Sequence, residues 1–194
     1  MPSTYTTRVK RKKLLDVLDY NKDGSIGAED IIVLSLKTPG IRINRDDYLA
    51  KELSTVCGQE TIDLAISTTP LDAGISKEEI ERLADEVVKY ERNCVSGISS
   101  FLGLPGGYVA IATVPADIIQ YYGFLLRAAQ KLMYLYGFPQ IVPNNGDSGI
   151  DTATINAITL CMGVMYAVNG ASKALFAISK AFANGVEKKL LQAA

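Results

Sequence analysis

The sequence of 194 residues contains no histidine and no tryptophan, and only three cysteines. Without an imidazole, the chain cannot form a Ser-His-Asp or Cys-His catalytic site, an HExxH zinc site or a histidine pH switch. Cys57, Cys94 and Cys161 are odd in number and lie far apart, which fits neither a disulfide framework nor a zinc cluster. We therefore predict reduced thiols in a cytoplasmic protein.

Neither sign of charge dominates, because 20 basic side chains stand against 21 acidic ones. The chain therefore has no overall field to attract nucleic acid, and we expect no nucleic-acid partner. The first residues are basic, but no apolar stretch follows them as it does in a secretory signal. Hydrophobic residues make up 48% of the chain, which is enough to bury a core.

Charge is spread unevenly along the chain. Residues 1–96 contain 31 of the 41 charged side chains, and residues 97–194 contain 10. Helical signals recur and strand signals are few, which predicts an all-α fold, a bundle-like helical domain with small-residue helix packing. We divide the chain into a short helix-loop-helix at residues 1–45, connecting helices at 46–75 and the main helical domain at 76–194.

Two long helices can be placed by their ends. Ser76 and Glu79 form a capping box that begins the first of them. Its charged residues between 78 and 91 are expected to form a solvated face. An apolar stripe at helical spacing consists of Ile80, Leu83, Val87, Val88 and Tyr90. Pro115 predicts the start of the second helix, and Gly137 predicts its end.

The most specific motif is DYNKDGSIGAED at residues 19–30, which has the spacing of a twelve-residue calcium loop. Alternate residues point inward in such a loop, and oxygen atoms are the ligands that a hard cation prefers. Gly24 falls at the sixth position, where the chain turns sharply, and Gly27 at the ninth leaves that ligand to water. The predicted ligands are the side chains of Asp19, Asn21, Asp23 and Asp30 and the backbone carbonyl of Ser25.

One position departs from the EF-hand pattern, since the twelfth residue is Asp30 in place of the bidentate glutamate. A dockerin loop resembles it more closely, because dockerin loops open with D-x-N-x-D-G and end in aspartate. Dockerins pair two such loops, whereas this sequence has no second one. We expect weak calcium binding, with a dissociation constant of roughly 10⁻⁵–10⁻³ M and with magnesium as a competitor. The alternative is a turn rich in Asn, Asp and Gly that joins two helices and holds no ion.

The apolar half contains the segment GLPGGYVAIATVPADIIQYYGFLLRAAQKLMYLYGF at residues 103–138. An LPGG break, a Pro-Ala-Asp helix start and a helix that ends in Tyr-Gly follow one another in it. In these features the segment resembles the bacterial EcsC family, over about residues 76–190. The resemblance implies an all-helical protein with no established catalytic residues, so it assigns no site residue here.

Three classes of function remain open. The first is a non-catalytic protein of EcsC type, in which calcium at residues 19–30 orders the flanking helices for a regulatory role or for a protein partner. The second is a membrane-associated protein that docks through small-residue helices around Gly163, Ala167 and Ala171 and through its basic N-terminus. The third is an enzyme. No catalytic constellation is recognisable for it, and Asp117 is interpreted as a carboxylate at a helix N-terminus.

Overall fold

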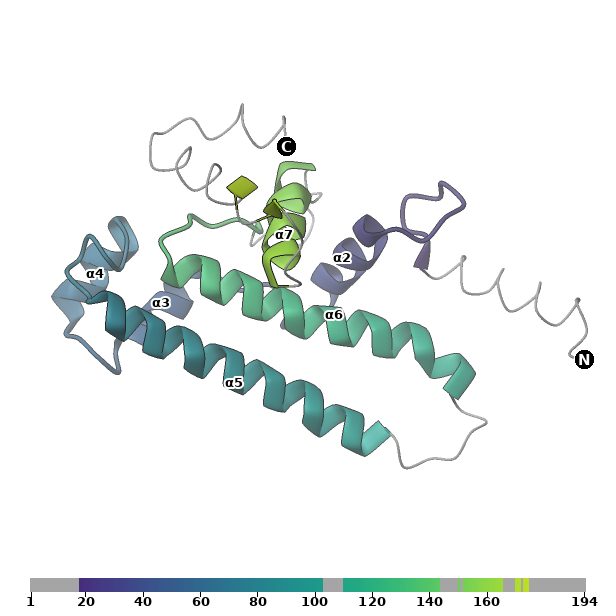
Figure 1. Ribbon diagram of the computed structural model, residues 1–194, viewed down its shortest axis with the longest axis horizontal. Coiled ribbons are helices and arrows are strands. Elements are labelled where there is room, and N and C mark those ends of the chain that lie inside the picture. Colours follow the sequence, from purple (N-terminus) through teal and green to yellow (C-terminus); the bar gives the residue numbers. More distant parts are fainter. Residues whose placement is uncertain are drawn as a thin grey trace, which may run out of the picture.

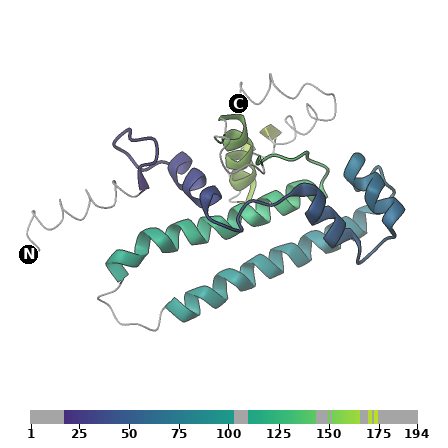
Figure 2. The same cartoon turned by 180° about the vertical axis from the view of Figure 1, so that it is seen from behind.

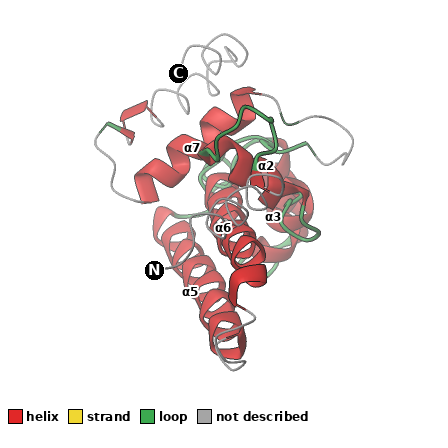
Figure 3. Cartoon of the chain, turned by 90° about the vertical axis from the view of Figure 1, so that its right-hand side faces the viewer, coloured by secondary structure: helices red, strands yellow, loops and turns green. Residues whose placement is uncertain are grey.

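The computed structural model describes residues 18–102, 110–143, 150, 152–165, 170–171 and 173–174. This part of the chain contains helices and loops but no strand, so the all-α prediction is confirmed there (Figure 3). The helices are α2 (Ala28–Lys37), α3 (Arg45–Leu53), α4 (Gln59–Ser67), α5 (Lys77–Leu102), α6 (Ala110–Leu135) and α7 (Thr152–Met165). The helix predicted before residue 18 and the basic N-terminus lie outside the described residues.

The fold is built around a long hairpin. Helices α5 and α6, of 26 residues each, run antiparallel and pack along their length (Figure 1). Helices α2 and α7 lie on the opposite side of α6, and α3 and α4 gather at the end where α5 begins (Figures 1 and 2). Helix α6 is therefore the central element, and the connected end of the hairpin extends beyond the other helices.

The two largest groups of buried side chains hold these elements together. The larger joins α3, α4, α5 and α6, and Leu49, Leu53, Leu83 and Tyr134 lie at its centre. The second joins α2, α6 and α7, and its members are Ile32, Leu36, Ile41, Leu126, Val142, Ile158 and Met162. Residues from all three predicted segments of the chain thus share one packed body, because each core draws on at least three helices.

Helix α5 begins as predicted, with the Ser76 hydroxyl accepting the Glu79 backbone N–H at 3.2 Å. Ile80, Leu83 and Val87 of the predicted stripe are buried. For the other two residues of the stripe the predicted burial is wrong, since the Val88 side chain is 47% and the Tyr90 side chain 57% exposed. Among the described residues α6 is the main neighbour of α5, and α3 and α4 join it near the start of α5; Val88 and Tyr90 lie outside the face that these helices cover.

Helix α6 ends where expected, at a glycine with positive φ, but it begins earlier than predicted. Gly137 has φ +87°, the left-handed conformation that terminates a helix. The helix starts at Ala110, so Pro115 is its sixth residue and Asp117 its eighth. The predicted start at Pro115 and the terminal position of Asp117 are wrong. At the sixth position proline removes the backbone hydrogen bond to residue 111 and its ring crowds that carbonyl, yet one helical turn still forms before it.

The buried Arg45 connects segments that are distant in sequence. Its guanidinium donates to the carbonyls of Ile66 at 2.7 Å and Thr68 at 3.1 Å, where α4 ends, and to the carbonyl of Phe138 at 3.0 Å. An arginine satisfies carbonyls at a helix C-terminus well, because both the hydrogen bonds and the helix dipole favour a cation there. Arg45 at the start of α3 therefore links the end of α4 to the segment that follows α6.

The three cysteines are unpaired, as predicted; Cys161 is buried, and Cys57 and Cys94 are half-buried. Burial raises the pKa of the Cys161 thiol to about 11. Among the described helices, none combines the length and the apolar character that crossing a bilayer requires. Of the small-residue positions predicted to dock on membranes, Gly163 lies in α7 and Ala171 is buried, while Ala167 lies outside the described residues.

Candidate metal centre

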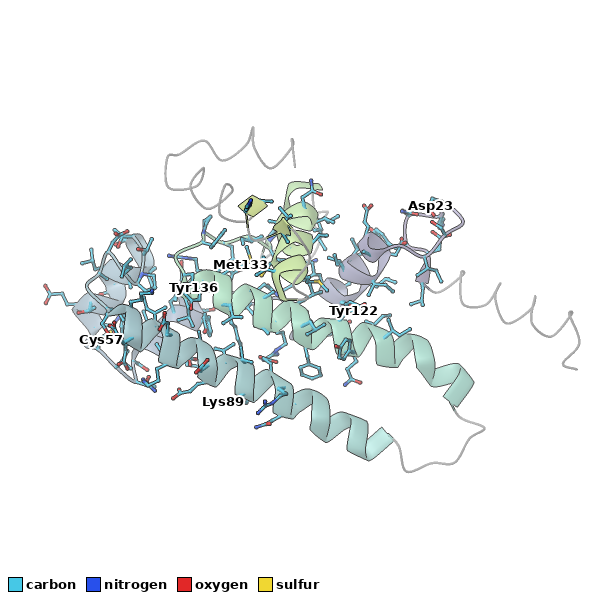
Figure 4. The ribbon with its side chains drawn as sticks, viewed as in Figure 1. Asp23, Cys57, Lys89, Tyr122, Met133 and Tyr136 are labelled. Carbon is cyan, nitrogen blue, oxygen red and sulfur yellow. The ribbon has the colours of Figure 1, made fainter. Side chains whose placement is uncertain are left out.

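Residues 19–30 form a compact loop that leads into α2 at the edge of the molecule, where Asp23 is labelled in Figure 4. Asp19 organises the first half of this 19–30 loop. Its carboxylate accepts the backbone N–H of Asp23 at 3.1 Å and that of Gly24 at 2.9 Å. The chain is thereby curled around the Asp19 carboxylate, as a cation loop requires of its first ligand.

The next two ligand positions continue the same curl. Asn21 Oδ1 accepts the Asp23 backbone N–H at 2.9 Å, and Asp23 Oδ1 accepts both the N–H and the hydroxyl of Ser25 at 2.7 Å. The Ser25 hydroxyl donation lowers the pKa of Asp23, followed by the backbone donation from the same residue. Asn21, Asp23 and Ser25 are exposed and Asp19 is half-buried, so an ion from solvent can reach them.

The backbone turns where the motif predicts. Gly24 has φ +88°, a conformation that glycine adopts without a steric penalty and that the sixth position of a calcium loop demands. Lys22 has φ +60°, which places a residue other than glycine in the left-handed region. Two left-handed residues within three positions make the loop tight enough for alternate side chains to converge.

Asp30 has a second role that the sequence reasoning missed. It is 1% exposed, and its Oδ1 accepts the N–H groups of Tyr20 at 2.9 Å and Asn21 at 3.1 Å. Its Oδ2 accepts the N–H of Gly27 at 2.8 Å, the residue that caps α2. Asp30 therefore joins the two ends of the loop and caps the helix. Its position three residues after the cap is the sequence signal that could have indicated this role.

The predicted ligands are thus brought together in part. Asp19, Asn21, Asp23 and Ser25 follow one another around the turn, whereas the Asp30 carboxylate is directed at backbone N–H groups. Within the described ranges, no three carboxylate, thiol or imidazole side chains are arranged to hold one metal ion. The donor set nevertheless fits a hard cation, because it is entirely oxygen. A carboxylate has about four lone-pair sites, so Asp19, which accepts two hydrogen bonds, and Asp23, which accepts three, keep lone pairs free.

A second group of ionised side chains lies between α5 and α6. In this Glu91 cluster (Glu91, Arg127 and Lys131), Glu91 Oε1 accepts from Lys131 Nζ at 2.6 Å and from Arg127 Nε at 3.3 Å. Arg127 also donates to the carbonyl of Gly40 at 2.6 Å, in the turn between α2 and α3. Glu91 was expected on a solvated face, but its side chain is only 4% exposed, because α6 covers it.

The cluster has a buried tyrosine beside it. Burial raises the pKa of Tyr48, and the charges of Glu52 and Glu91 raise it further. Tyr48 Oη and Glu91 Oε2 are buried without a hydrogen-bond partner among the described residues. Sequence reasoning missed this cluster because its members are 36 and 40 residues apart and no local motif connects them.

Comparison of the chain with protein-family models, with curated proteins and with solved structures gave no match. The chemistry of the 19–30 loop is therefore inferred from its residues and their geometry alone.

Proposed function

We propose that the 19–30 loop binds calcium and that the protein is a non-catalytic regulatory or interaction module. The observation that carries the proposal is the Asp19 carboxylate, which accepts the N–H groups of Asp23 and Gly24 and so curls three further oxygen-bearing residues around one turn. Asp19, Asn21, Asp23 and the Ser25 carbonyl would hold the ion together with water. The Asp30 carboxylate would become a further ligand if it gave up one of its hydrogen bonds from a backbone N–H and bound the ion instead.

The loop is well placed to transmit ion binding, because α2 follows it directly. The Ser35 hydroxyl of α2 donates to the Ile119 carbonyl of α6 at 3.0 Å, and Ile32 and Leu36 are buried against α6 and α7. Cation binding relieves the repulsion between the carboxylates of the loop and so stabilises the start of α2. The predicted consequence is a more ordered attachment of α2 to the central helix, with no chemical step.

Thermal unfolding of the full chain with and without calcium tests this proposal. At a calcium concentration tenfold above the dissociation constant, the folded state gains about 1.4 kcal/mol, which raises Tm by about 3–6 °C for a chain of this size. Asp19→Ala should abolish the rise. Asp85→Ala, which removes an exposed carboxylate of α5, is the matched control and should retain it.

The same titration with magnesium measures selectivity, and we expect a smaller rise in Tm because the loop keeps few rigid ligands for an octahedral ion. An unchanged Tm in about 10 mM calcium, which is tenfold above the weakest expected dissociation constant, would overturn the proposal and leave the loop as an ion-free turn that joins two helices. The resemblance to the EcsC family and the cytoplasmic location remain part of the proposal. They are supported by the Tyr-Gly end of α6 at Gly137 and by the three unpaired cysteines.

A further inference from the structure

Side chains from three helices meet beside the Glu91 cluster. Tyr48 comes from α3, Glu91 from α5 and Lys131 from α6. Lys131 Nζ lies 2.6 Å from Glu91 Oε1 and 5.9 Å from the centre of the Tyr48 ring. Burial, and after it the charges of Glu52 and Glu91, raise the pKa of Tyr48, so Tyr48 and Glu91 lie within electrostatic reach of each other. The junction of α3 with the hairpin is therefore a polar site at the edge of the larger core.

Two oxygen atoms of this junction have no hydrogen-bond partner within the part of the chain that the structure describes. They are Tyr48 Oη and Glu91 Oε2. Tyr48 is 7% exposed and the Glu91 side chain 4%, so bulk solvent does not reach either atom. A buried hydroxyl or carboxylate oxygen that stays unpaired destabilises a fold, and native proteins therefore pair nearly all such atoms.

Both side chains are held in place by other contacts, so neither turns toward solvent to find a partner. Glu91 is held through Oε1, which accepts from Lys131 and Arg127. The Tyr48 ring lies against the ring of Tyr134, with centroids 6.4 Å apart, and belongs to the larger core. The structure has no direct hydrogen bond between Tyr48 Oη and Glu91 Oε2. The two oxygens therefore require a small partner from outside the chain.

The charges at the junction favour a neutral partner. A metal cation would lie beside the charged groups of Lys131 and Arg127, and an anion would face the acceptor oxygen of Glu91. The Tyr48 hydroxyl stays protonated and can donate, whereas an ionised Glu91 can only accept. One water molecule satisfies both atoms. Lys131 has three N–H donors, of which the bond to Glu91 Oε1 uses one, so it can supply the third partner that buried waters typically have.

We infer that one water molecule binds at the junction of α3, α5 and α6, where it accepts from Tyr48 Oη and donates to Glu91 Oε2. The water completes the hydrogen bonds of the Glu91 cluster and joins α3 to the hairpin through polar contacts, in addition to the apolar ones. It is therefore a fixed component of the fold. The site is separate from the 19–30 loop and does not depend on calcium.

The sign of a change in Tm tests the site, with Tyr48→Phe in the full chain and in EDTA. If the water binds, the variant removes a paired hydroxyl and leaves the water short of a partner, so Tm should fall by about 2–4 °C. Tyr134→Phe is the matched control and should show a similar fall, because the buried Tyr134 hydroxyl donates to the Ile43 carbonyl at 3.3 Å. Tyr136→Phe, at an exposed ring, should leave Tm unchanged. An unchanged or raised Tm for Tyr48→Phe would overturn the inference, because the loss of an unpaired hydroxyl does not destabilise the fold.

A crystal structure of the full chain locates the partner itself. We expect one peak of electron density within about 3.2 Å of both Tyr48 Oη and Glu91 Oε2, and a weaker peak in crystals of Tyr48→Phe. A direct hydrogen bond between the two oxygens would overturn the inference even if Tm falls, and so would a peak that is bonded to only one of them. Since calcium is absent from both measurements, neither bears on the metal proposal, and a failed calcium titration does not bear on the water site.

Discussion

The 19–30 loop and the Glu91 cluster both depend on carboxylates, but in opposite surroundings. In the loop, the carboxylates that solvent reaches, Asp19 and Asp23, accept backbone N–H groups from residues at most 5 positions away. In the cluster, a buried carboxylate accepts from side chains 36 and 40 positions away. Water can compete for the hydrogen bonds of the loop carboxylates, whereas bulk water is excluded from the buried Glu91 carboxylate. The loop can therefore exchange a hydrogen bond for an ion, whereas the cluster fixes how two helices pack.

The largest expected effect comes from breaking the buried cluster. Glu91→Ala leaves Lys131 and Arg127 without their carboxylate between α5 and α6, which we expect to lower the free energy of unfolding by about 3 kcal/mol. Glu86→Ala is the matched control on the exposed face of α5, where the pair with Arg82 is solvated and should contribute much less than the buried one. Urea unfolding of both variants measures the difference, and equal losses would show that the burial of Glu91 has no energetic importance.

An intermediate effect is expected at Asp30, which belongs to the exposed loop but is itself buried. Asp30→Ala removes the acceptor of three backbone N–H groups and the cap of α2, so the unfolding free energy should fall by about 2 kcal/mol even without calcium. Glu29→Ala removes an exposed carboxylate from the same turn and should cost about 0.3 kcal/mol. Thermal unfolding in EDTA separates the two. A loss at Asp30 that occurs only in calcium would contradict the capping role.

The smallest effect concerns Asp23, which is fully exposed. Because its pKa is lowered from 3.8 in the folded state, ionised Asp23 contributes stability above that pH, and the contribution is lost as the pH falls through the lowered pKa. Carboxyl NMR of the calcium-free protein should place its titration midpoint below 3.8. Ser25→Ala removes the hydroxyl that lowers the pKa most, so the midpoint should rise. An unmoved midpoint would show that this hydroxyl does not bond to Asp23 in solution.

Local signals predicted the features that depend on neighbouring residues. The cap of α5 at Ser76, the end of α6 at Gly137 and the sharp turn at Gly24 were all predictable, because each follows from backbone conformation or from a hydrogen bond across three residues. The start of α6 was predicted wrongly at Pro115, since proline permits a helix to begin but does not require it to begin there.

Burial was less predictable than helix position. Val88 and Glu91 both follow helical periodicity, yet the apolar Val88 is exposed and the charged Glu91 is buried. Which side of α5 is covered depends on where α6 lies, and the sequence of α5 does not contain that information. The partners of Glu91 were unpredictable for the same reason.

By itself, the sequence determined the helical class and the turn at residues 19–30, because propensity and capping are properties of short segments. The tertiary structure alone decided that α6 is the central helix and that Glu91 pairs with Arg127 and Lys131. These features require elements distant in the chain to meet, and the pattern of packing across the whole molecule determines which elements do so.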